Sequence, residues 1–125
     1  MTAETIVTGL CLAFERLDAD ELIGYFADEA VYHNVPLPPS RGRAQIYASL
    51  SGLRSRFKAV RVEMLHTVSA GDLVMNERID HFTFHDGAMV SLPIAGIFEL
   101  ESGKVVAWRD YFDLATFTRH ATPRT

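Results

Sequence analysis

Cysteine is almost absent from this sequence, since Cys11 is the only one in 125 residues. A single cysteine cannot form an internal disulfide, and it has no partner for a metal-binding or redox motif. Because cysteines without such partners are commonly buried, we expect Cys11 to be a core residue of a helix.

The sequence also lacks long apolar runs and clusters of basic residues. No window is long and apolar enough to span a bilayer, and no basic segment precedes the first apolar positions as in a secretory signal. The net charge is −4 and the basic residues are scattered, which excludes the electrostatic footprint of a nucleic-acid-binding protein. We therefore expect a cytoplasmic protein that binds neither nucleic acid nor membrane.

Patterns that would hold a metal or a cofactor are missing as well. The five histidines form no ligand constellation, so no metal is expected. No glycine-rich loop connects a strand to a helix in a way that would cradle a phosphate, and no nucleophile elbow is present. We expect a protein that works without a cofactor.

The composition is that of a globular protein, with 48% hydrophobic and 22% charged residues. A chain of 125 residues buries roughly two-thirds of its unfolded surface, which suffices for a core that contains a pocket. We expect a single domain over residues 1–125.

The first half of the sequence predicts three helices and one short strand. Apolar residues recur at helical spacing from Glu4 to Leu17. Asp18 stands three residues before Glu21, a carboxylate variant of the capping box that predicts the start of a second helix. The expected elements are helices over residues 4–17, 18–28 and 43–57, and a strand over residues 30–34 that Pro36 ends.

The second half predicts four strands, because three short breaks that end in glycine divide residues 59–114 into apolar runs. Each break, at residues 69–71, 85–87 and 101–103, fits a three-residue hairpin loop with a left-handed glycine. The corresponding pairs are Val68 with Asp72, Phe84 with Ala88 and Leu100 with Lys104.

This register places the even-numbered residues of all four strands on one face. That face is overwhelmingly apolar, whereas we expect the odd-numbered face to point outward and to be partly covered by another subunit. The expected architecture is α+β, with three helices packed on the concave face of a curved antiparallel sheet. The inner face would hold Val60, Val62, Met64, His66, Val68, Val74, Asn76, Arg78, Asp80, Phe82, Phe84, Val90, Leu92, Ile94, Gly96, Phe98, Val106, Trp108, Asp110 and Phe112.

Three charged residues interrupt this apolar face: Arg78, Asp80 and Asp110. A lone buried charge is so costly that such groups pair with one another or change protonation state. In the predicted register Ile94 lies between Arg78 and Asp110, which are two strand spacings apart, roughly 9.5 Å. A guanidinium can bridge this gap and hold two carboxylates, so we predict an Asp–Arg–Asp cluster.

The cluster has a structural and a catalytic interpretation. It could simply be an ion cluster that determines the register of the sheet. However, two carboxylates share one guanidinium, and the unmatched negative charge should raise the pKa of one of them. Two carboxyl groups with separated pKa values are what general acid–base catalysis requires, which favours the catalytic interpretation.

Tyr32 and Asn34 lie on one side of the strand that stops before Pro36. Their phenol and carboxamide could hold a small polar molecule, such as water, beside Asp110. Taken individually, Tyr32 could be a core aromatic residue and Asn34 a turn former before the proline. Only the combination with the charged cluster favours a binding role.

Three motifs give the sequence a resemblance to a known family. They are Tyr-x-Asn-x-Pro-Leu-Pro-Pro at residues 32–39, Glu-Arg-x-Asp at residues 77–80 and Trp-Arg-Asp-Tyr-Phe-Asp-Leu at residues 108–114. Together, and in this order, they resemble the limonene-1,2-epoxide hydrolases over nearly the whole chain. The resemblance implies the cone-shaped α+β fold of nuclear transport factor 2, usually as a homodimer. It also implies hydrolysis of a small apolar epoxide to a vicinal diol, without a covalent intermediate.

The resemblance further implies a role for each matched residue. Asp110 would be the base that deprotonates water, Tyr32 and Asn34 would hold that water, Asp80 would protonate the epoxide oxygen, and Arg78 would bridge the carboxylates. We expect apolar side chains to form the rest of the pocket, although each could equally be plain core. These are Leu53, Phe57, Phe82, Leu92, Ile94, Trp108 and Phe112.

Three alternatives stay open at this point. An aspartate could attack the epoxide itself, because water and carboxylate attack would use similar residues. The same cone fold could carry another enzyme, such as a ketosteroid isomerase or polyketide cyclase, in which one aspartate moves protons next to a carbonyl. Finally, the chain could be a non-catalytic small-molecule-binding or dimerisation module in which the charged cluster is structural.

Overall fold

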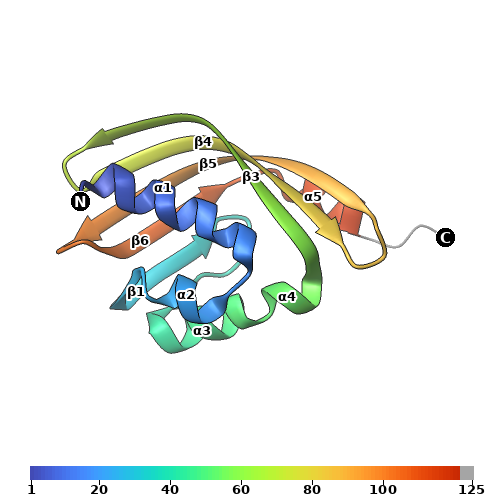
Figure 1. Cartoon of the computed structure of the whole chain (residues 1–125), viewed down its shortest axis with the longest axis horizontal. Helices are drawn as coiled ribbons and strands as arrows, with labels where there is room; N and C mark the ends of the chain where they lie inside the picture. The colour runs from blue at the N-terminus through green and yellow to red at the C-terminus, as the bar shows by residue number, and fades with distance from the viewer. Residues whose placement is uncertain (122–125) are drawn as a thin grey trace.

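A computed structural model of the chain describes residues 1–121 and shows an α+β fold around one curved, six-stranded sheet (Figure 1). The strand order is β2-β1-β6-β5-β4-β3. The sheet is mixed, because β1 runs parallel to β6 while the other neighbours are antiparallel. The strands are β1 Phe26–Asn34, β2 Ser40–Arg41, β3 Phe57–Ala70, β4 Leu73–Phe84, β5 Met89–Glu101 and β6 Lys104–Tyr111.

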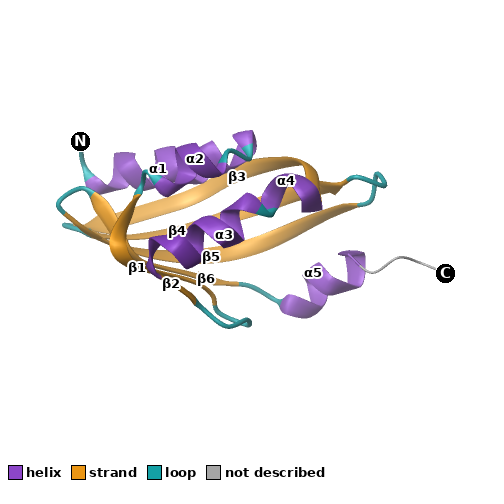
Figure 2. Ribbon diagram, turned by 90° about the horizontal axis from the view of Figure 1, so that it is seen from below, coloured by secondary structure: helices purple, strands orange, loops and turns teal. Residues whose placement is uncertain are grey.

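Helices α1 to α4 pack within the curve of the sheet, and α5 lies apart from them beyond the end of β6 (Figure 2). None of the helices within residues 1–121 has the length and apolar character needed to cross a membrane. The helices are α1 Ala3–Ala13, the 3-10 turn η1 Phe14–Arg16, α2 Ala19–Ile23, α3 Gly42–Ser51, α4 Leu53–Arg56 and α5 Leu114–Ala121.

The amino-terminal helices follow the sequence prediction, with different ends. The Asp18 side chain accepts hydrogen bonds from the backbone N–H groups of Asp20 and Glu21, so the predicted cap of α2 is confirmed. The second helix ends at Ile23 rather than near Asp28, and β1 begins at Phe26. The predicted third helix is divided at Gly52 into α3 and α4.

Of the three predicted hairpin loops, only the one between β4 and β5 is correct. There the backbone N–H of Phe84 donates to the carbonyl of Ala88, and Gly87 has a φ of 92°. The β3–β4 turn has two residues between the paired Ala70 and Leu73, and the β5–β6 turn has two between Glu101 and Lys104. The prediction was wrong at these two turns because glycine also serves as a central residue of two-residue turns.

Two β-bulges compensate for the shorter turns. One lies at Leu65, since Met64 pairs with Arg78 and His66 with Glu77, and the other lies at Val106. Each bulge inserts one residue, so that beyond it the even-numbered residues again share a face. Consequently Val68 is 63% exposed instead of lying on the inner face.

Because of the bulges, the predicted inner face was wrong at three positions. His66 and Val68 precede the β3–β4 turn and do not point into the core. At the other bulge, Val105 is the fully buried residue in place of Val106.

Trp108 forms the centre of the aromatic core. Its indole packs against the rings of Phe14, Phe26, Tyr32 and Phe98, with centroid distances between 4.6 and 6.1 Å. Such large, close-packed rings give a stiff wall, because aromatic residues bury much area in few rotamers. Trp108 therefore provides a rigid support for the charged residue two positions later in β6.

Helix α5 was not predicted from the sequence. Asp113 caps its first turn, accepting hydrogen bonds from the backbone N–H and the hydroxyl of Thr116 at 3.2 and 2.6 Å. Phe117 then packs against Phe57 and Phe82, with ring centroids 6.3 and 5.6 Å apart. An aspartate three residues before a threonine was the available signal for this helix start.

Candidate active site

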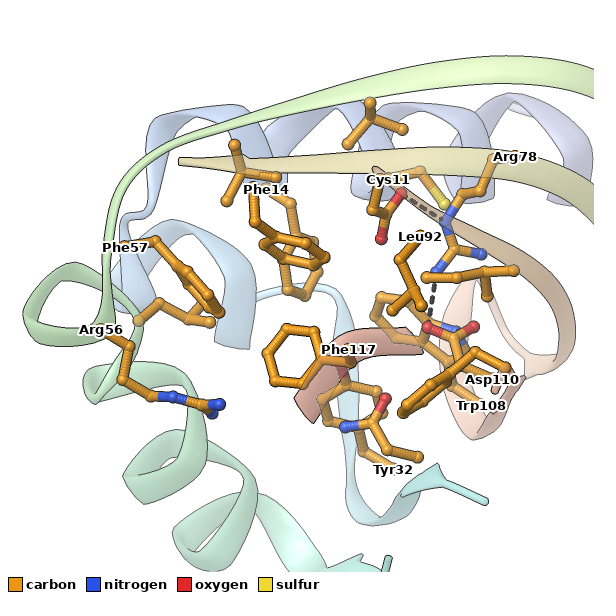
Figure 3. Close-up of a pocket in the computed structure, with 18 of the residues that line it drawn as sticks. Cys11, Phe14, Tyr32, Arg56, Phe57, Arg78, Leu92, Trp108, Asp110 and Phe117 are labelled. Atoms are coloured by element: carbon orange, nitrogen blue, oxygen red, sulfur yellow. Dashed lines mark hydrogen bonds and ion pairs between the residues drawn. The ribbon is translucent and has the colours of Figure 1, made fainter. Parts of the chain in front are cut away.

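A cavity of about 120 Å³ lies between the concave face of the sheet and the helices (Figure 3). Every residue that the sequence singled out for the site lines it. These are the polar residues Tyr32, Asn34, Arg78, Asp80 and Asp110 and the apolar residues Leu53, Phe57, Phe82, Leu92, Ile94, Trp108 and Phe112.

Arg78 lies between the two carboxylates at one side of this cavity. Its Nε donates to Asp80 Oδ1 at 3.1 Å, and its Nη2 donates to Asp110 Oδ2 at 2.5 Å. The exposed fractions of the three side chains are 3% for Arg78, 14% for Asp80 and 4% for Asp110. The guanidinium thus uses separate donors for the two carboxylates, of which Asp80 is the more exposed.

The Arg78 side chain reaches Asp110 by passing over Gly96 of β5 and not over Ile94, which corrects the predicted register. Asp110 pairs with Gly96, and Arg78 pairs with Ile94, so the two charged residues lie diagonally across β5. A Cβ atom on residue 96 would stand 2.6 Å from Arg78 Nη1. The guanidinium therefore occupies the space that any side chain at position 96 would need.

Two further polar side chains complete the cluster, and the sequence reasoning did not assign them a role in it. Asn76 Oδ1 accepts from Arg78 Nη1 at 3.0 Å, and Trp108 Nε1 donates to Asp110 Oδ1 at 2.6 Å. Asn76 stands two positions before Arg78, and Trp108 stands two positions before Asp110. Their alternation along β4 and β6 was thus the available signal, because residues two apart share a face.

Burial changes the protonation behaviour of Asp80. Burial raises the pKa of Asp80 to about 6, and the negative charge of Asp110 acts in the same direction, while Arg78 opposes both. Burial alone would lower the pKa of Arg78, but the charges of Asp110 and Asp80 raise it, so the guanidinium stays cationic. Asp80 can therefore carry a proton near neutral pH beside a permanent positive charge.

Tyr32 and Asn34 reach the same part of the cavity from β1. The parallel pairing of β1 with β6 sets Tyr32 beside Trp108 and Asn34 beside Asp110. The Tyr32 ring stacks on the Trp108 indole with centroids 4.6 Å apart. Burial raises the pKa of the Tyr32 phenol above its usual range, so the hydroxyl keeps its proton and can donate a hydrogen bond.

The cavity is also lined by residues that the sequence analysis did not assign to it. These are Cys11, Phe14, Leu37, Arg56, Val60, Val62 and Phe117. The expectation that Cys11 is buried in a helix is confirmed, since it is 2% exposed within α1. Burial raises the pKa of its thiol to about 12, which excludes a thiolate nucleophile near neutral pH. Within residues 1–121, no group of three His, Cys, Asp or Glu side chains is placed to hold a metal ion.

A known enzyme family matches almost the whole chain. The sequence pattern of the limonene-1,2-epoxide hydrolase catalytic domain matches residues 2–124. The chain belongs to this family. It is also 31% identical over 104 residues to the epoxide hydrolase EphG of Mycobacterium tuberculosis, an alignment that covers 82% of this chain and 67% of EphG.

Solved structures of this family and fold superpose closely on the chain. A limonene-epoxide-hydrolase-like epoxide hydrolase from M. tuberculosis matches with a TM-score of 0.83 and 26% identity, over 95% of this chain and 88% of that one. A protein from Burkholderia pseudomallei, described as similar to nuclear transport factor 2 and of unknown function, matches with a TM-score of 0.85 and 18% identity, over 98% and 100% of the chains. The predicted α+β cone fold is thereby confirmed.

The close approach of Arg78 to Gly96 predicts that Gly96→Ala destabilises the protein. The added methyl group would collide with the guanidinium and with Asn76 Oδ1, so we expect a loss of about 1–3 kcal/mol in the free energy of unfolding. Urea denaturation measures this loss. Gly9→Ala is the matched control, because its Cβ would stand 3.5 Å from the Tyr25 hydroxyl, an ordinary contact within α1. An unchanged free energy of unfolding in Gly96→Ala would contradict the close approach of the Arg78 guanidinium to position 96.

Proposed function

We propose that this protein hydrolyses a small apolar epoxide to a vicinal diol in one step, by general acid–base catalysis. The observation that carries the proposal is the arrangement of Asp80, Arg78 and Asp110 on the wall of an apolar cavity, in a chain of the limonene-1,2-epoxide hydrolase family. An epoxide is strained but a poor electrophile near neutral pH. Protonating its oxygen while a base activates water lowers the barrier from both sides.

In this proposal Asp110 is the general base. It removes a proton from a water molecule held between its carboxylate and the side chains of Tyr32 and Asn34. The water oxygen attacks one carbon of the epoxide ring and breaks that carbon–oxygen bond. Trp108 Nε1 and Arg78 Nη2 each hold one oxygen of Asp110, which fixes the direction of the carboxylate during the attack.

Asp80 is the general acid in the same proposal. With a pKa of about 6 it can hold a proton and deliver it to the epoxide oxygen as the ring opens. At the end of the turnover Asp110 carries the proton from water and Asp80 is ionised. The enzyme returns to its starting state when one proton leaves Asp110 and one returns to Asp80 through solvent.

Arg78 keeps the total charge of the site low throughout this cycle. One negative charge starts on Asp110 and ends on Asp80, and the guanidinium contacts both positions. Because its donors already point at both carboxylates, little reorganisation accompanies the shift of charge. Asn76 restrains the guanidinium through a fourth group that does not titrate.

The rest of the cavity supports an apolar substrate. Its wall is built largely of aromatic and aliphatic side chains, among them Phe57, Phe82, Leu92 and Phe112. Such a lining binds the hydrocarbon part of a substrate by burying its apolar surface.

Homodimer formation stays a prediction. The outer face of the sheet supports it, because Met75 and Tyr111 are 44% and 43% exposed. Met75 pairs with Ile97, and Tyr111 pairs with Ala95, so these apolar residues lie together on neighbouring strands.

Replacing the proposed base tests the proposal. Asp110→Asn keeps the size of the side chain but cannot accept the proton from water, so we expect diol formation from limonene oxide or cyclohexene oxide to fall about 100- to 10,000-fold in kcat. Asp28→Asn is the matched control, because that side chain is 95% exposed.

Circular dichroism of both variants separates the outcomes. A folded Asp110→Asn protein that has lost turnover supports the enzyme. Loss of the fold in Asp110→Asn, together with no activity of the native protein, would favour a structural cluster in a non-catalytic module. Turnover of a ketosteroid or polyketide in place of an epoxide would favour the alternative enzymes.

The raised pKa of Asp80 predicts the pH dependence. The acid must be protonated to act, and its pKa in the folded protein is about 6, so kcat/KM for the epoxide should fall as the pH rises through this value. Well above it, the loss approaches tenfold for each further pH unit. Initial rates between about pH 5 and pH 9 measure the profile, and a flat profile across this range would contradict the role of Asp80.

A further inference from the structure

Arg56 is the charged residue of the cavity wall that does not belong to the catalytic cluster. It ends α4, and its side chain lines the cavity. Figure 3 shows it on the opposite side of the cavity from Arg78 and Asp110, with Phe117 between them in the view. The cavity therefore has a cation at each side.

The two cations differ in their partners. Arg78 contacts two carboxylates, but no carboxylate of residues 1–121 lies within 4.0 Å of the Arg56 guanidinium. The contacts of Arg56 are with rings, since its Cζ lies 5.1 Å from the centroid of Phe57 and 5.8 Å from that of Phe117. A guanidinium whose contacts are cation–π contacts with rings keeps its N–H donors available for a planar anion.

We infer that Arg56 binds a carboxylate of the substrate, so that the natural epoxide carries an anionic group at the end remote from the ring. This inference rests on the proposed function, and it changes the natural substrate from an uncharged apolar epoxide to an epoxide of a hydrophobic acid. A carboxylate suits the site because the fork of guanidinium donors matches its two oxygens. The apolar wall between the two sides would cover the hydrocarbon that joins the two groups.

The strand register gives the scale of that hydrocarbon. Arg56 directly precedes Phe57 at the start of β3, whereas Val62 of the same strand pairs with Asp80. The five residue steps from Phe57 to Val62 span about 16 Å along the strand. The Arg56 side chain shortens the separation between its guanidinium and Asp80, because it reaches back over the Phe57 ring. The expected substrate is therefore extended, with several carbon atoms between the epoxide and the carboxylate.

A pair of probes that differ in charge and by one methyl group tests the inference: the epoxide of undecylenic acid and its methyl ester. We expect the native protein to hydrolyse the acid with a kcat/KM about tenfold above that of the ester, with the difference in KM. Arg56→Gln should remove the advantage of the acid, so that kcat/KM for the acid falls to about the value for the ester. Arg61→Gln, at an exposed position of β3, is the matched control and should leave both unchanged.

Binding of the saturated acid, undecanoate, gives a second measurement that does not need turnover. By calorimetry, the native protein should bind undecanoate about tenfold more tightly than undecanol, and Arg56→Gln should bind both alike. If no epoxide is hydrolysed but this preference is found, the proposed function fails while the anion site stands.

Two results would overturn the inference. One is equal kcat/KM for acid and ester together with equal affinity for undecanoate and undecanol in the native protein. The other is an equal loss for both members of each pair in Arg56→Gln, which would make Arg56 a packing partner of Phe57 and Phe117.

Discussion

The ion pairs of Arg78 with Asp80 and Asp110 are the interaction on which the site depends. Three charged side chains are almost wholly enclosed by an apolar core, and each is tolerated only because the others are there. Removing one partner would leave an uncompensated buried charge. The neighbouring residues therefore have to keep the three groups within hydrogen-bonding distance.

The backbone around the cluster meets this requirement in several places. Gly96 leaves the space through which the guanidinium reaches Asp110. The bulge at Val106 brings Asp110 opposite Gly96, because it restores the even alignment that the short β5–β6 turn shifts. Trp108, held among aromatic rings, then fixes the second oxygen of Asp110. The position and burial of Asp110 thus follow from the same few contacts.

Much of this arrangement could be predicted from the sequence, since alternation in a strand places Arg78, Asp80 and Asp110 on the inner face. Such reasoning cannot give the turn lengths, because a glycine fits two-residue and three-residue turns alike. The errors at Val68 and Val106, and the placement of Ile94 in place of Gly96, all follow from that ambiguity. Phe117 and Arg56 were missed for a different reason. They line the cavity from α5 and α4, and the packing of these short helices depends on tertiary contacts.

In the proposed mechanism, water activated by Asp110 attacks the epoxide directly. A single turnover in oxygen-labelled water, with the protein in excess over the epoxide, tests it most directly. The new hydroxyl oxygen of the diol should carry the label, and the peptide that contains Asp110 should not. An unlabelled diol after this first turnover would show attack by a carboxylate oxygen and would contradict direct attack by water.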